Sequence, residues 1–451
     1  MKKKIQGSER RNFLKASGAT LLASSLGVNA LAHSTSPFFN DNKVLKVGLI
    51  GCGGRGTGAA NQAMNSDPKV ILTAMADVFP DRLEKSYNAL KTENAEKLQV
   101  PDENKFIGFD AYKKVLASDV DVVLLTTPPS FRPGHLEAAI AAGKHVFCEK
   151  PVAVDAPGIR RVIEVAKKAK EKNLALMSGF CWRYDLPKRA TYERILNGDI
   201  GKVTGIYNTY NTGALWERER KADWNDMEFI MRNWLYYNWL SGDHIAEQAV
   251  HSIDLMSWAM GDVLPIKAVG TGGRQSRTDD RYGNVYDHFA IVYEYADNIR
   301  GFHFSRQQKG CKRAYDITIQ GDRGQCYIDV FRKHEITGAV NWKYKGEKNN
   351  MYQTEHDELF ASIRAGKPIN DGVRMAHSTM LAIWGRMVAY TGEELTWDKA
   401  INSEEKLVDL FGHCANFYSE DLGHCTNMHR SWTTVTNQAN GINRGVQYLL
   451  G

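Results

Sequence analysis

The feature that most constrains the fold of this chain is an apolar strand that runs directly into a glycine-rich turn. The segment Lys46-Val-Gly-Leu-Ile-Gly51-Cys-Gly53-Gly-Arg-Gly56 has this form. Glycines at these spacings permit a tight turn, a close approach of backbone N–H groups to a pyrophosphate, and close packing of the following helix on the strand. The segment therefore predicts a Rossmann-type domain that binds a dinucleotide. The residues expected to line its phosphate loop are Gly51, Gly53, Gly54, Arg55 and Gly56.

The order of elements around this turn predicts a doubly wound α/β domain. Apolar, strand-like runs cover residues 44–50, 70–76, 120–126, 145–148 and 174–179, and helical stretches cover 55–64, 80–94, 135–142 and 155–172. Strands that alternate with helices form parallel sheets with helices on both faces. We therefore expect an N-terminal Rossmann domain over residues 44–180.

The pattern changes after about residue 185, where alternating apolar and polar residues predict an open, mostly antiparallel sheet. Expected strands cover residues 203–211, 266–271, 285–295, 300–304, 315–321 and 325–330, and helical character returns over 243–260 and 353–391. A chain of 451 residues is long enough for two domains. We expect an α+β substrate-binding domain over residues 181–390 and a C-terminal tail over 391–451.

The N-terminus has the features of a bacterial export signal. Ser8-Glu-Arg10-Arg11-Asn-Phe-Leu14-Lys15 resembles the twin-arginine motif, and Ala30-Leu-Ala32 fits a cleavage site. The apolar stretch between them is too short to span a bilayer. We therefore expect a signal peptide over residues 1–32, a linker over 33–43, a periplasmic location and no membrane span. Most of the formal net charge of +6 lies in this signal, so no nucleic-acid-binding surface is expected.

The cysteines and histidines do not predict a disulfide framework or a metal site. The seven cysteines include no Cys-x-x-Cys pair. The segment from His413 to His429 gathers histidines and cysteines, but their spacing matches no common zinc pattern. We expect no metal.

Two further segments of the first domain are placed to contact the cofactor. Asp77 ends the second expected strand, where a carboxylate accepts hydrogen bonds from the adenosine ribose and repels a 2′-phosphate, so NAD is favoured over NADP. Thr127 and Pro128 follow another strand, over which the nicotinamide half would lie. His135 comes shortly after them, and its simplest role is to stabilise this turn and the start of the next helix.

The segment Gly143-Lys-His-Val-Phe-Cys-Glu149-Lys150-Pro151 places a lysine at the exit of the nucleotide-binding domain. Together with the glycine loop, with Thr126-Thr-Pro-Pro129 and with Gly179-Phe-Cys-Trp-Arg183-Tyr184-Asp, this segment resembles the Gfo/Idh/MocA oxidoreductase family. The resemblance covers roughly residues 44–390. It implies a Rossmann domain, a second domain whose open sheet carries the substrate and often the oligomer interface, and activity on sugars, polyols and their derivatives.

The resemblance also implies the catalytic residues. Lys150 would lie beside the nicotinamide and stabilise the alkoxide that forms as hydride leaves, and Glu149 would contact the nicotinamide ribose. His251 would be the general base, and Glu247, four residues earlier on the same expected helix, would orient it. His244 lies in the same segment and is a rival base that also belongs to the expected substrate pocket.

The expected substrate pocket takes its other residues from two places. Arg183 and Tyr184 follow a strand that ends near the cofactor. Trp216 and Trp234 belong to an aromatic-rich insertion, and aromatic faces with interleaved polar groups suit sugar rings. An aromatic core or a subunit interface explains the same insertion equally well.

These observations predict an exported oxidoreductase that transfers hydride between a ring hydroxyl of a sugar or glycoside and NAD. An exported enzyme meets no pool of free NAD, so the cofactor is expected to be tightly bound. The chain is expected to form a homo-oligomer through its C-terminal sheet. The alternative is a glycosidase that oxidises its substrate transiently, eliminates the leaving group and then reduces the ketone, with no net redox change.

Overall fold

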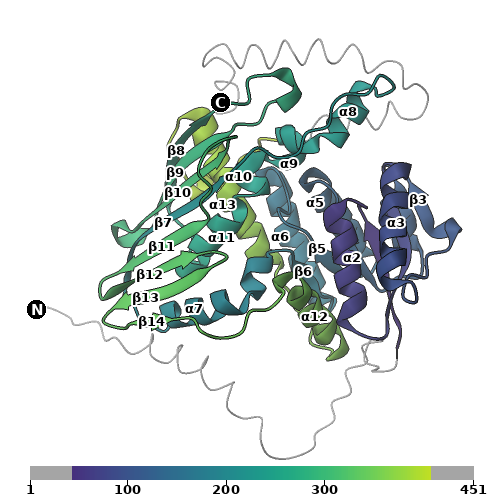
Figure 1. Cartoon of the computed structure of the whole chain (residues 1–451), viewed down its shortest axis with the longest axis horizontal. Helices are drawn as coiled ribbons and strands as arrows, with labels where there is room; N and C mark the ends of the chain where they lie inside the picture. Colours follow the sequence, from purple (N-terminus) through teal and green to yellow (C-terminus); the bar gives the residue numbers. More distant parts are fainter. Residues whose placement is uncertain (1–42, 408–451) are drawn as a thin grey trace, which may run out of the picture.

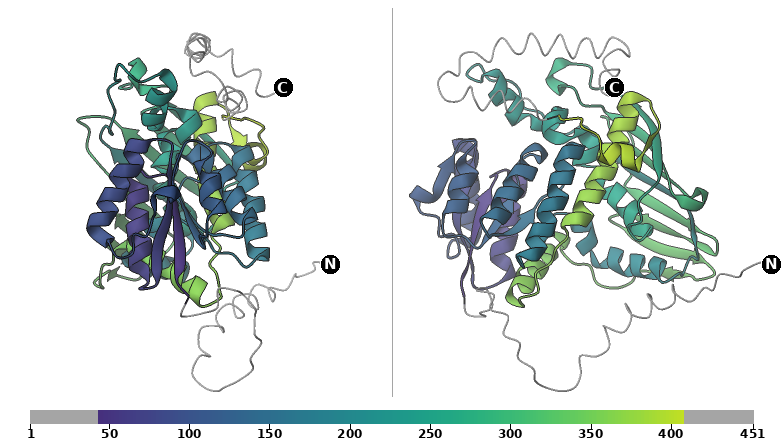
Figure 2. Two further views of the ribbon diagram at one scale, coloured as in Figure 1. Left: turned by 90° about the vertical axis from the view of Figure 1, so that its right-hand side faces the viewer. Right: turned by 180° about the vertical axis from the view of Figure 1, so that it is seen from behind.

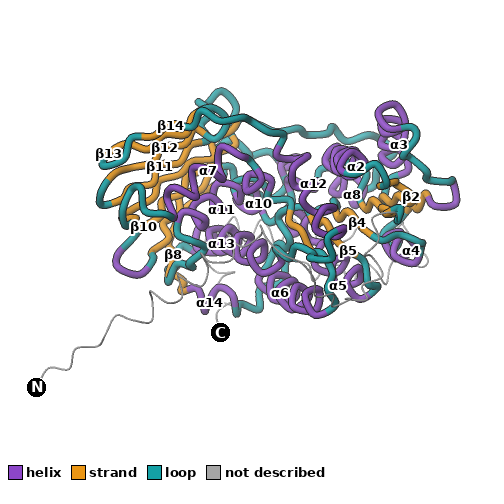
Figure 3. The backbone as a smooth tube through the Cα atoms, turned by 90° about the horizontal axis from the view of Figure 1, so that it is seen from below, coloured by secondary structure: helices purple, strands orange, loops and turns teal. Residues whose placement is uncertain are grey.

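The computed structural model describes residues 43–407, which form two sheets with helices between them (Figure 1). The predicted signal peptide, nearly all of the linker and the segment from His413 to His429 lie outside the described residues. Figure 3 shows the two groups of strands at opposite ends of the molecule. Within residues 43–407, no helix is both long and apolar enough to cross a membrane.

The first sheet is parallel and has six strands in the order β3-β2-β1-β4-β5-β6, as the doubly wound pattern predicted. Its strands are β1 (Leu45–Ile50), β2 (Val70–Asp77), β3 (Lys105–Ile107), β4 (Val122–Leu125), β5 (His145–Cys148) and β6 (Leu176–Ser178). Helices α2 (Gly54–Ser66), α3 (Pro80–Asn94), α4 (Ala111–Ala117), α5 (Arg132–Ala141) and α6 (Ala156–Glu171) cover it. Every residue of β4 and β5 is buried, because a parallel sheet is covered on both faces.

The second sheet has nine strands in the order β14-β13-β12-β11-β7-β10-β9-β8-β15. The strands are β7 (Val203–Thr212), β8 (Lys267–Gly273), β9 (His288–Glu294), β10 (Arg300–Gln307), β11 (Asp316–Gly321), β12 (Gly324–Asp329), β13 (Lys333–Gly338), β14 (Trp342–Lys343) and β15 (Leu395–Thr396). β7 and β10 pair in parallel, and the other pairs are antiparallel. The prediction of a mostly antiparallel sheet is confirmed.

Helices from the second half of the chain fill the space between the sheets (Figure 2). α13 (Gly372–Thr391) packs against α6 of the first domain and against β8 of the second. α12 (Met351–Arg364) returns to the first domain, where Leu359, Phe360 and Ile363 join the apolar core that contains Ala59 and Met64 of α2. The two sheets therefore share one interior, and residues from both can meet between them.

The second domain extends further than the sequence pattern indicated. β15 pairs with β8, and α14 (Trp397–Ile401) follows it and packs on α6 and α13. Residues 395–401 are thus part of the folded domain rather than of a tail. The pattern missed them because a two-residue edge strand has no period to detect.

The aromatic-rich insertion between β7 and β8 reaches back over the first domain. It contains α8 (Asp226–Arg232) and α9 (Asn238–Ser241), which lie on the side of the first domain near α5 in Figure 1. Its apolar cluster, formed by Met231, Leu235, Tyr236, Tyr237, Trp239 and Leu240, packs against Phe79, Phe109 and Phe131 of the Rossmann domain. The sequence pattern did not predict which way this insertion runs, and the structure shows that it packs on the Rossmann domain.

Candidate active site

The glycine loop between β1 and α2 has the form that the dinucleotide motif requires. Gly51 has φ of +101°, and a Cβ at this position would lie 2.8 Å from the backbone carbon of Thr126. A Cβ on Gly56 would lie 1.9 Å from the carbonyl oxygen of Gly51. In contrast, a Cβ on Gly54 would meet no atom within 4 Å, so the loop is open on this side. The N-terminus of α2 has no side-chain cap, which leaves backbone N–H groups for an anion.

The carboxylate of Asp77 fastens this loop to the end of β2. One of its oxygens accepts a hydrogen bond from the Cys52 N–H at 2.7 Å, and the other accepts one from the Phe79 N–H at 2.9 Å. Burial raises the pKa of Asp77, and these two hydrogen bonds oppose the rise. The carboxylate keeps lone pairs for a further donor, so a ribose contact for Asp77 stays a prediction that this geometry permits.

A cavity of about 330 Å³ opens in front of the glycine loop. Of the predicted cofactor contacts, the ones that line it are Gly51, Gly53, Gly54, Arg55, Gly56, Asp77, Thr127, Pro128 and His135. This lining fits a dinucleotide. The unobstructed glycines and the uncapped backbone N–H groups at the start of α2 suit a phosphate, and the Asp77 carboxylate suits a ribose. Lys150, Glu247 and His251 are not among its lining residues, so the cavity does not include the residues of the expected chemistry.

His135 lies in a mainly structural setting at the edge of this cavity. Its ring packs against Tyr112 with centroids 4.2 Å apart, and its Nδ1 lies 3.4 Å from the Thr127 hydroxyl. Burial, aided by the charge of Arg132, lowers the pKa of His135 to about 3. The ring is therefore neutral at physiological pH and supports the turn after β4.

Arg55 and Glu149, which were expected to contact different parts of the cofactor, form an ion pair with each other. The Arg55 guanidinium donates to Glu149 and to Glu355 of α12, and its carbon lies 5.0 Å from the centre of the Tyr352 ring. Glu355 is completely buried, and burial raises its pKa well above the ordinary value. A phosphate contact for Arg55 stays a prediction. Within residues 43–407, the guanidinium is instead bound to the carboxylates of Glu149 and Glu355.

Lys150 and Glu247 form the polar centre between the two sheets. Lys150 follows β5, and its Nζ donates to the Glu247 carbonyl oxygen at 2.6 Å and lies 3.6 Å from the Glu247 carboxylate. Both side chains are mostly buried, and Glu247 Oε2 has no hydrogen-bond partner in the structure. The arrangement holds a positive charge at a fixed point at the carboxyl end of the first sheet.

Glu247 and His251 do not share one helix, contrary to the spacing argument. Glu247 ends α10 (Asp243–Glu247), and His251 lies in the first turn of α11 (Val250–Ala259). At the break, the His244 carbonyl oxygen accepts from the N–H groups of both Gln248 and Ala249. The Nδ1 of His251 has no hydrogen-bond partner in the structure, so the proposed orienting bond from Glu247 is not formed.

Aromatic packing holds the His251 ring instead. The ring stacks on Trp182 with centroids 4.9 Å apart and meets the edge of Phe180 at 6.0 Å. Burial lowers the pKa of His251 well below its ordinary value of 6.5, and the charges of Lys150, Lys188 and Arg55 lower it further. His251 is thus a neutral imidazole, which is the form that a general base needs.

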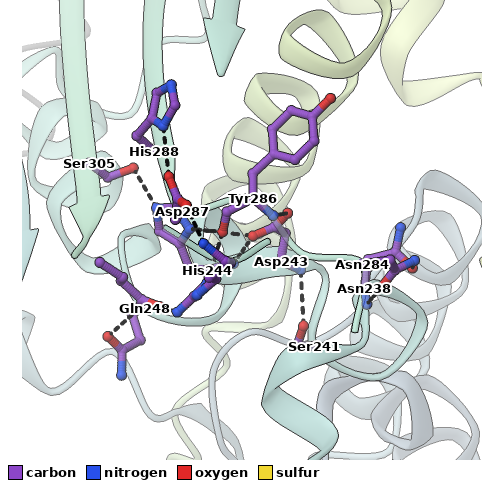
Figure 4. Close-up of polar contacts among 12 residues, drawn as sticks. Asn238, Ser241, Asp243, His244, Gln248, Asn284, Tyr286, Asp287, His288 and Ser305 are labelled. Atoms are coloured by element: carbon purple, nitrogen blue, oxygen red, sulfur yellow. Dashed lines mark hydrogen bonds and ion pairs between the residues drawn. The ribbon is translucent and has the colours of Figure 1, made fainter. Parts of the chain in front are cut away.

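A buried polar network fixes α10, and with it Glu247, on the second sheet (Figure 4). Asp243, at φ of +70°, accepts from the Tyr286 N–H at 2.8 Å and from the Tyr390 hydroxyl at 2.5 Å. The two ring nitrogens of His244 lie 3.0 Å from the Tyr286 carbonyl oxygen and 3.2 Å from the Ser305 hydroxyl. Both nitrogens of His244 are therefore occupied, and the structure favours His251 over its rival as the base.

Arg183 and Tyr184 are directed into the protein interior rather than into a pocket. The Arg183 guanidinium donates to Asp254 of α11 and to Asp262, and it is 8% exposed. The Tyr184 hydroxyl donates to Asp371 at 2.8 Å. The structure thus does not bring these two residues to Lys150 and His251, and it gives both a positioning role.

Trp216 and Trp234 line the cavity in front of the glycine loop. Their rings lie 6.2 Å apart, and the Arg218 guanidinium carbon lies 4.4 Å from the centre of the Trp216 ring. They are therefore grouped with the expected cofactor contacts and not with the catalytic residues. A direct sugar contact for either tryptophan stays a prediction that this placement does not favour.

Sequence reasoning missed the residues that surround His251. Trp182 also stacks with Tyr210 of β7, and Tyr210 meets Tyr315 edge to face. Trp182 stands one position before Arg183 in the motif that was recognised, so the motif contained the signal. Tyr210 and Tyr315 were read as ordinary strand residues, and only the packing of the two domains reveals them. In the part of the chain from 43 to 407, no three His, Cys, Asp or Glu side chains gather as a candidate metal site.

The comparisons with known proteins agree with this fold. Residues 45–180 match "Oxidoreductase family, NAD-binding Rossmann fold", and residues 189–327 match "GFO/IDH/MocA C-terminal domain". A myo-inositol 2-dehydrogenase of Thermotoga maritima is 34% identical over 311 residues, which are 68% of this chain and 81% of the relative. An inositol 2-dehydrogenase of Rhizobium meliloti is 24% identical over 329 residues, 70% and 86% of the two chains.

Solved structures show the same fold. The aldose-aldose oxidoreductase of Caulobacter crescentus superimposes with a TM-score of 0.63 at 17% identity, covering 78% of this chain and 100% of that one. A levoglucosan dehydrogenase in complex with NADH and levoglucosan gives 0.62 at 17% identity, covering 78% and 99%.

The fold and the site together define a two-domain, NAD-binding oxidoreductase. More particularly, the chain belongs to the Gfo/Idh/MocA oxidoreductase family, as its motifs predicted.

Proposed function

We propose that this protein is an exported dehydrogenase that transfers hydride between a ring hydroxyl of a sugar, polyol or glycoside and a tightly bound NAD. The observation that carries the proposal is the meeting of Lys150, Glu247 and a neutral His251 between the two domains. These groups supply a fixed cation and a proton acceptor, which are what the oxidation of an alcohol requires.

The residues divide the chemistry between them. Bound NAD would supply the hydride acceptor beside Lys150. His251 takes the hydroxyl proton on a ring nitrogen, because its depressed pKa keeps the imidazole neutral at physiological pH. The ammonium of Lys150, held by Glu247, stabilises the negative charge that develops on the substrate oxygen.

The surroundings of His251 support a carbohydrate-like substrate. Tyr210 and Tyr315, which pack with Trp182 beside the His251 ring, carry both aromatic faces and hydroxyls. This combination suits a ring whose C–H faces stack and whose hydroxyls need partners. The relatives named above act on inositols, and one structural neighbour was solved with an anhydrosugar.

Export and cofactor retention follow from the N-terminus. Residues 1–32 have the twin-arginine pattern, and that route carries proteins that have already folded around a cofactor. Outside the cytoplasm, lost NAD could not be replaced. The enzyme must therefore keep its NAD and reoxidise it in place with a second substrate.

One experiment tests the proposal on the full chain. The protein is purified, its bound nucleotide is released and identified, and the holoenzyme is then incubated with inositols, free sugars and glycosides. A keto product that appears together with reduced nicotinamide supports the dehydrogenase. A free sugar released from a glycoside with the nicotinamide unchanged would contradict it and support the transient-oxidation glycosidase instead.

A further inference from the structure

The cavity in front of the glycine loop is built from both domains. Its floor is the phosphate loop, and its opposite wall comes from the insertion between β7 and β8, through Trp216, Arg218, Met231 and Trp234. A Rossmann domain alone would leave this side open to solvent. The insertion therefore completes a site that lies apart from Lys150 and His251.

The charges that face this cavity are unbalanced. Arg82 of α3 and Arg218 both line it, and neither makes an ion pair at salt-bridge distance among residues 43–407. The nearby Asp77 carboxylate attracts Arg82 without forming such a pair, and Arg218 donates to the Arg232 carbonyl oxygen at 2.8 Å. The Nη2 of Arg82 is buried without a hydrogen-bond partner in the structure. Burial and the nearby positive charges lower the pKa of Arg218, because each arginine repels the others. A bound anion would relieve this repulsion.

An ion pair between Arg232 and Asp81, here called the latch, joins the insertion to the first domain beside the cavity. Arg232 donates to both carboxylate oxygens of Asp81, at 2.9 and 3.0 Å, and its guanidinium carbon lies 4.0 Å from the centre of the Phe79 ring. This contact neutralises Arg232, which leaves Arg82 and Arg218 as the arginines of the cavity lining that have no ion pair among residues 43–407. It also joins the insertion, which carries Trp216 and Trp234, to the residues that follow β2.

We infer that the insertion is the retaining wall of the cofactor site. Arg218 and Arg82 bind the pyrophosphate of the dinucleotide, Trp216 and Trp234 cover it from solvent, and the Arg232–Asp81 pair keeps the wall closed. The inference rests on the proposed function for the identity of the ligand, and it adds how the NAD is retained. The dinucleotide is buried by a segment that the sequence suggested for the substrate.

The test uses ADP and adenosine as probes of nucleotide-stripped full chain, and the holoenzyme for release of NAD. In Arg218→Met, ADP affinity falls about 10- to 100-fold, as the loss of a charge-assisted contact requires, whereas adenosine, which has no pyrophosphate, binds as before. In Trp216→Ala and in the latch variant Asp81→Asn, NAD dissociates at least about tenfold faster. Arg220→Met is the matched control, because Arg220 lies in the same insertion, pairs with Asp226 and does not line the cavity.

The outcomes separate the two proposals. If Arg218→Met binds ADP as tightly as the wild type and the Trp216 and Asp81 variants hold NAD as long, the inference is overturned. Loss of adenosine binding together with ADP binding in Arg218→Met also overturns it, because the defect would then be structural. If the variants behave as expected and no sugar or glycoside is oxidised, the retaining wall stands and the proposed function fails.

Discussion

At the scale of single residues, the position of Lys150 could be predicted from the sequence, whereas the contacts of His251 could not. The position of Lys150 after β5 follows from the Glu-Lys-Pro segment and a buried strand, both visible in the sequence. The partner of His251 was not visible, since a spacing of four residues indicates a helical pair only if the helix continues. The structure replaces the expected carboxylate by the face of Trp182.

Replacing Lys150 by methionine tests the charge at the catalytic centre. Methionine keeps much of the length of the side chain but removes the ammonium, so the developing alkoxide loses its stabilisation. We expect the rate constant for hydride transfer to fall about 10²- to 10³-fold, measured as reduction of bound NAD in a single turnover. NAD content should be unchanged, because Lys150 does not line the cavity in front of the glycine loop. A variant within about threefold of the wild type would remove Lys150 from the mechanism.

The environment of His251 predicts the acid side of the pH–rate profile. Because burial and neighbouring cations hold its pKa well below 6.5, the base stays unprotonated as the pH falls through 6.5. The rate of alcohol oxidation should therefore stay level down to pH values well under 6.5 and fall only below that. His251→Ala should lower the rate about 10²- to 10⁴-fold. An acid limb centred at or above pH 6.5 that persists in His251→Ala would assign the base elsewhere.

At the scale of elements, regular segments were predictable and interruptions were not. Strand β5 and helix α3 have the bounds that the pattern predicted. The break between α10 and α11, where the His244 carbonyl oxygen accepts from both Gln248 and Ala249, was not predicted. Nor were the contacts that hold the start of α10, since the buried carboxylate of Asp243 is bound by Tyr286 and Tyr390 from distant parts of the chain. Likewise, the guanidinium of Arg183 is directed by Asp262, which lies far along the sequence from it.

The start of α2 offers a matched pair of glycine substitutions. Gly56→Ala places a Cβ 1.9 Å from the Gly51 carbonyl oxygen, so the backbone must move, and we expect the free energy of unfolding to fall by about 3 kcal/mol. Gly54→Ala meets no atom within 4 Å, and it should raise that free energy by up to about 1 kcal/mol through the loss of unfolded-state freedom. Denaturant titration of both variants measures the difference, and equal effects would contradict the loop geometry.

At the scale of the whole molecule, the two-domain organisation was predictable and the meeting of the domains was not. The pattern of apolar and helical segments predicted a parallel sheet followed by a mostly antiparallel one, and the structure confirms both. The direction of the insertion depends on the Arg232–Asp81 pair and on apolar packing with Phe79. A single sequence carries no signal for either contact. For this reason Trp216 and Trp234 were expected at the substrate, whereas the structure places them at the cavity in front of the glycine loop.

The buried histidines predict how stability depends on pH. Burial lowers the pKa of His135, His303 and His356 to about 3 and of His145 and His334 to about 4. In His145 the Nδ1 accepts a hydrogen bond from the Ala175 N–H at 2.9 Å, a bond that protonation of this nitrogen would break. The unfolded chain binds protons on these groups near pH 6.5, whereas the folded chain does not, so stability is lost as the pH falls from about 6.5 toward 4.

Each such histidine costs on the order of 2 kcal/mol of stability at pH 5, and together they should lower the melting temperature steeply between pH 6.5 and 5. Calorimetry over this interval measures the effect, since the slope of stability against pH gives the protons taken up on unfolding. Replacing His303 by asparagine should reduce that uptake by about one proton, because the His303 side chain is fully buried. A melting temperature that stays constant from pH 6.5 to 5 would contradict the burial of these rings. The raised pKa values of Asp77 and Glu355 oppose the effect at only two groups, and carboxylates with ordinary or depressed pKa values titrate mainly below this range.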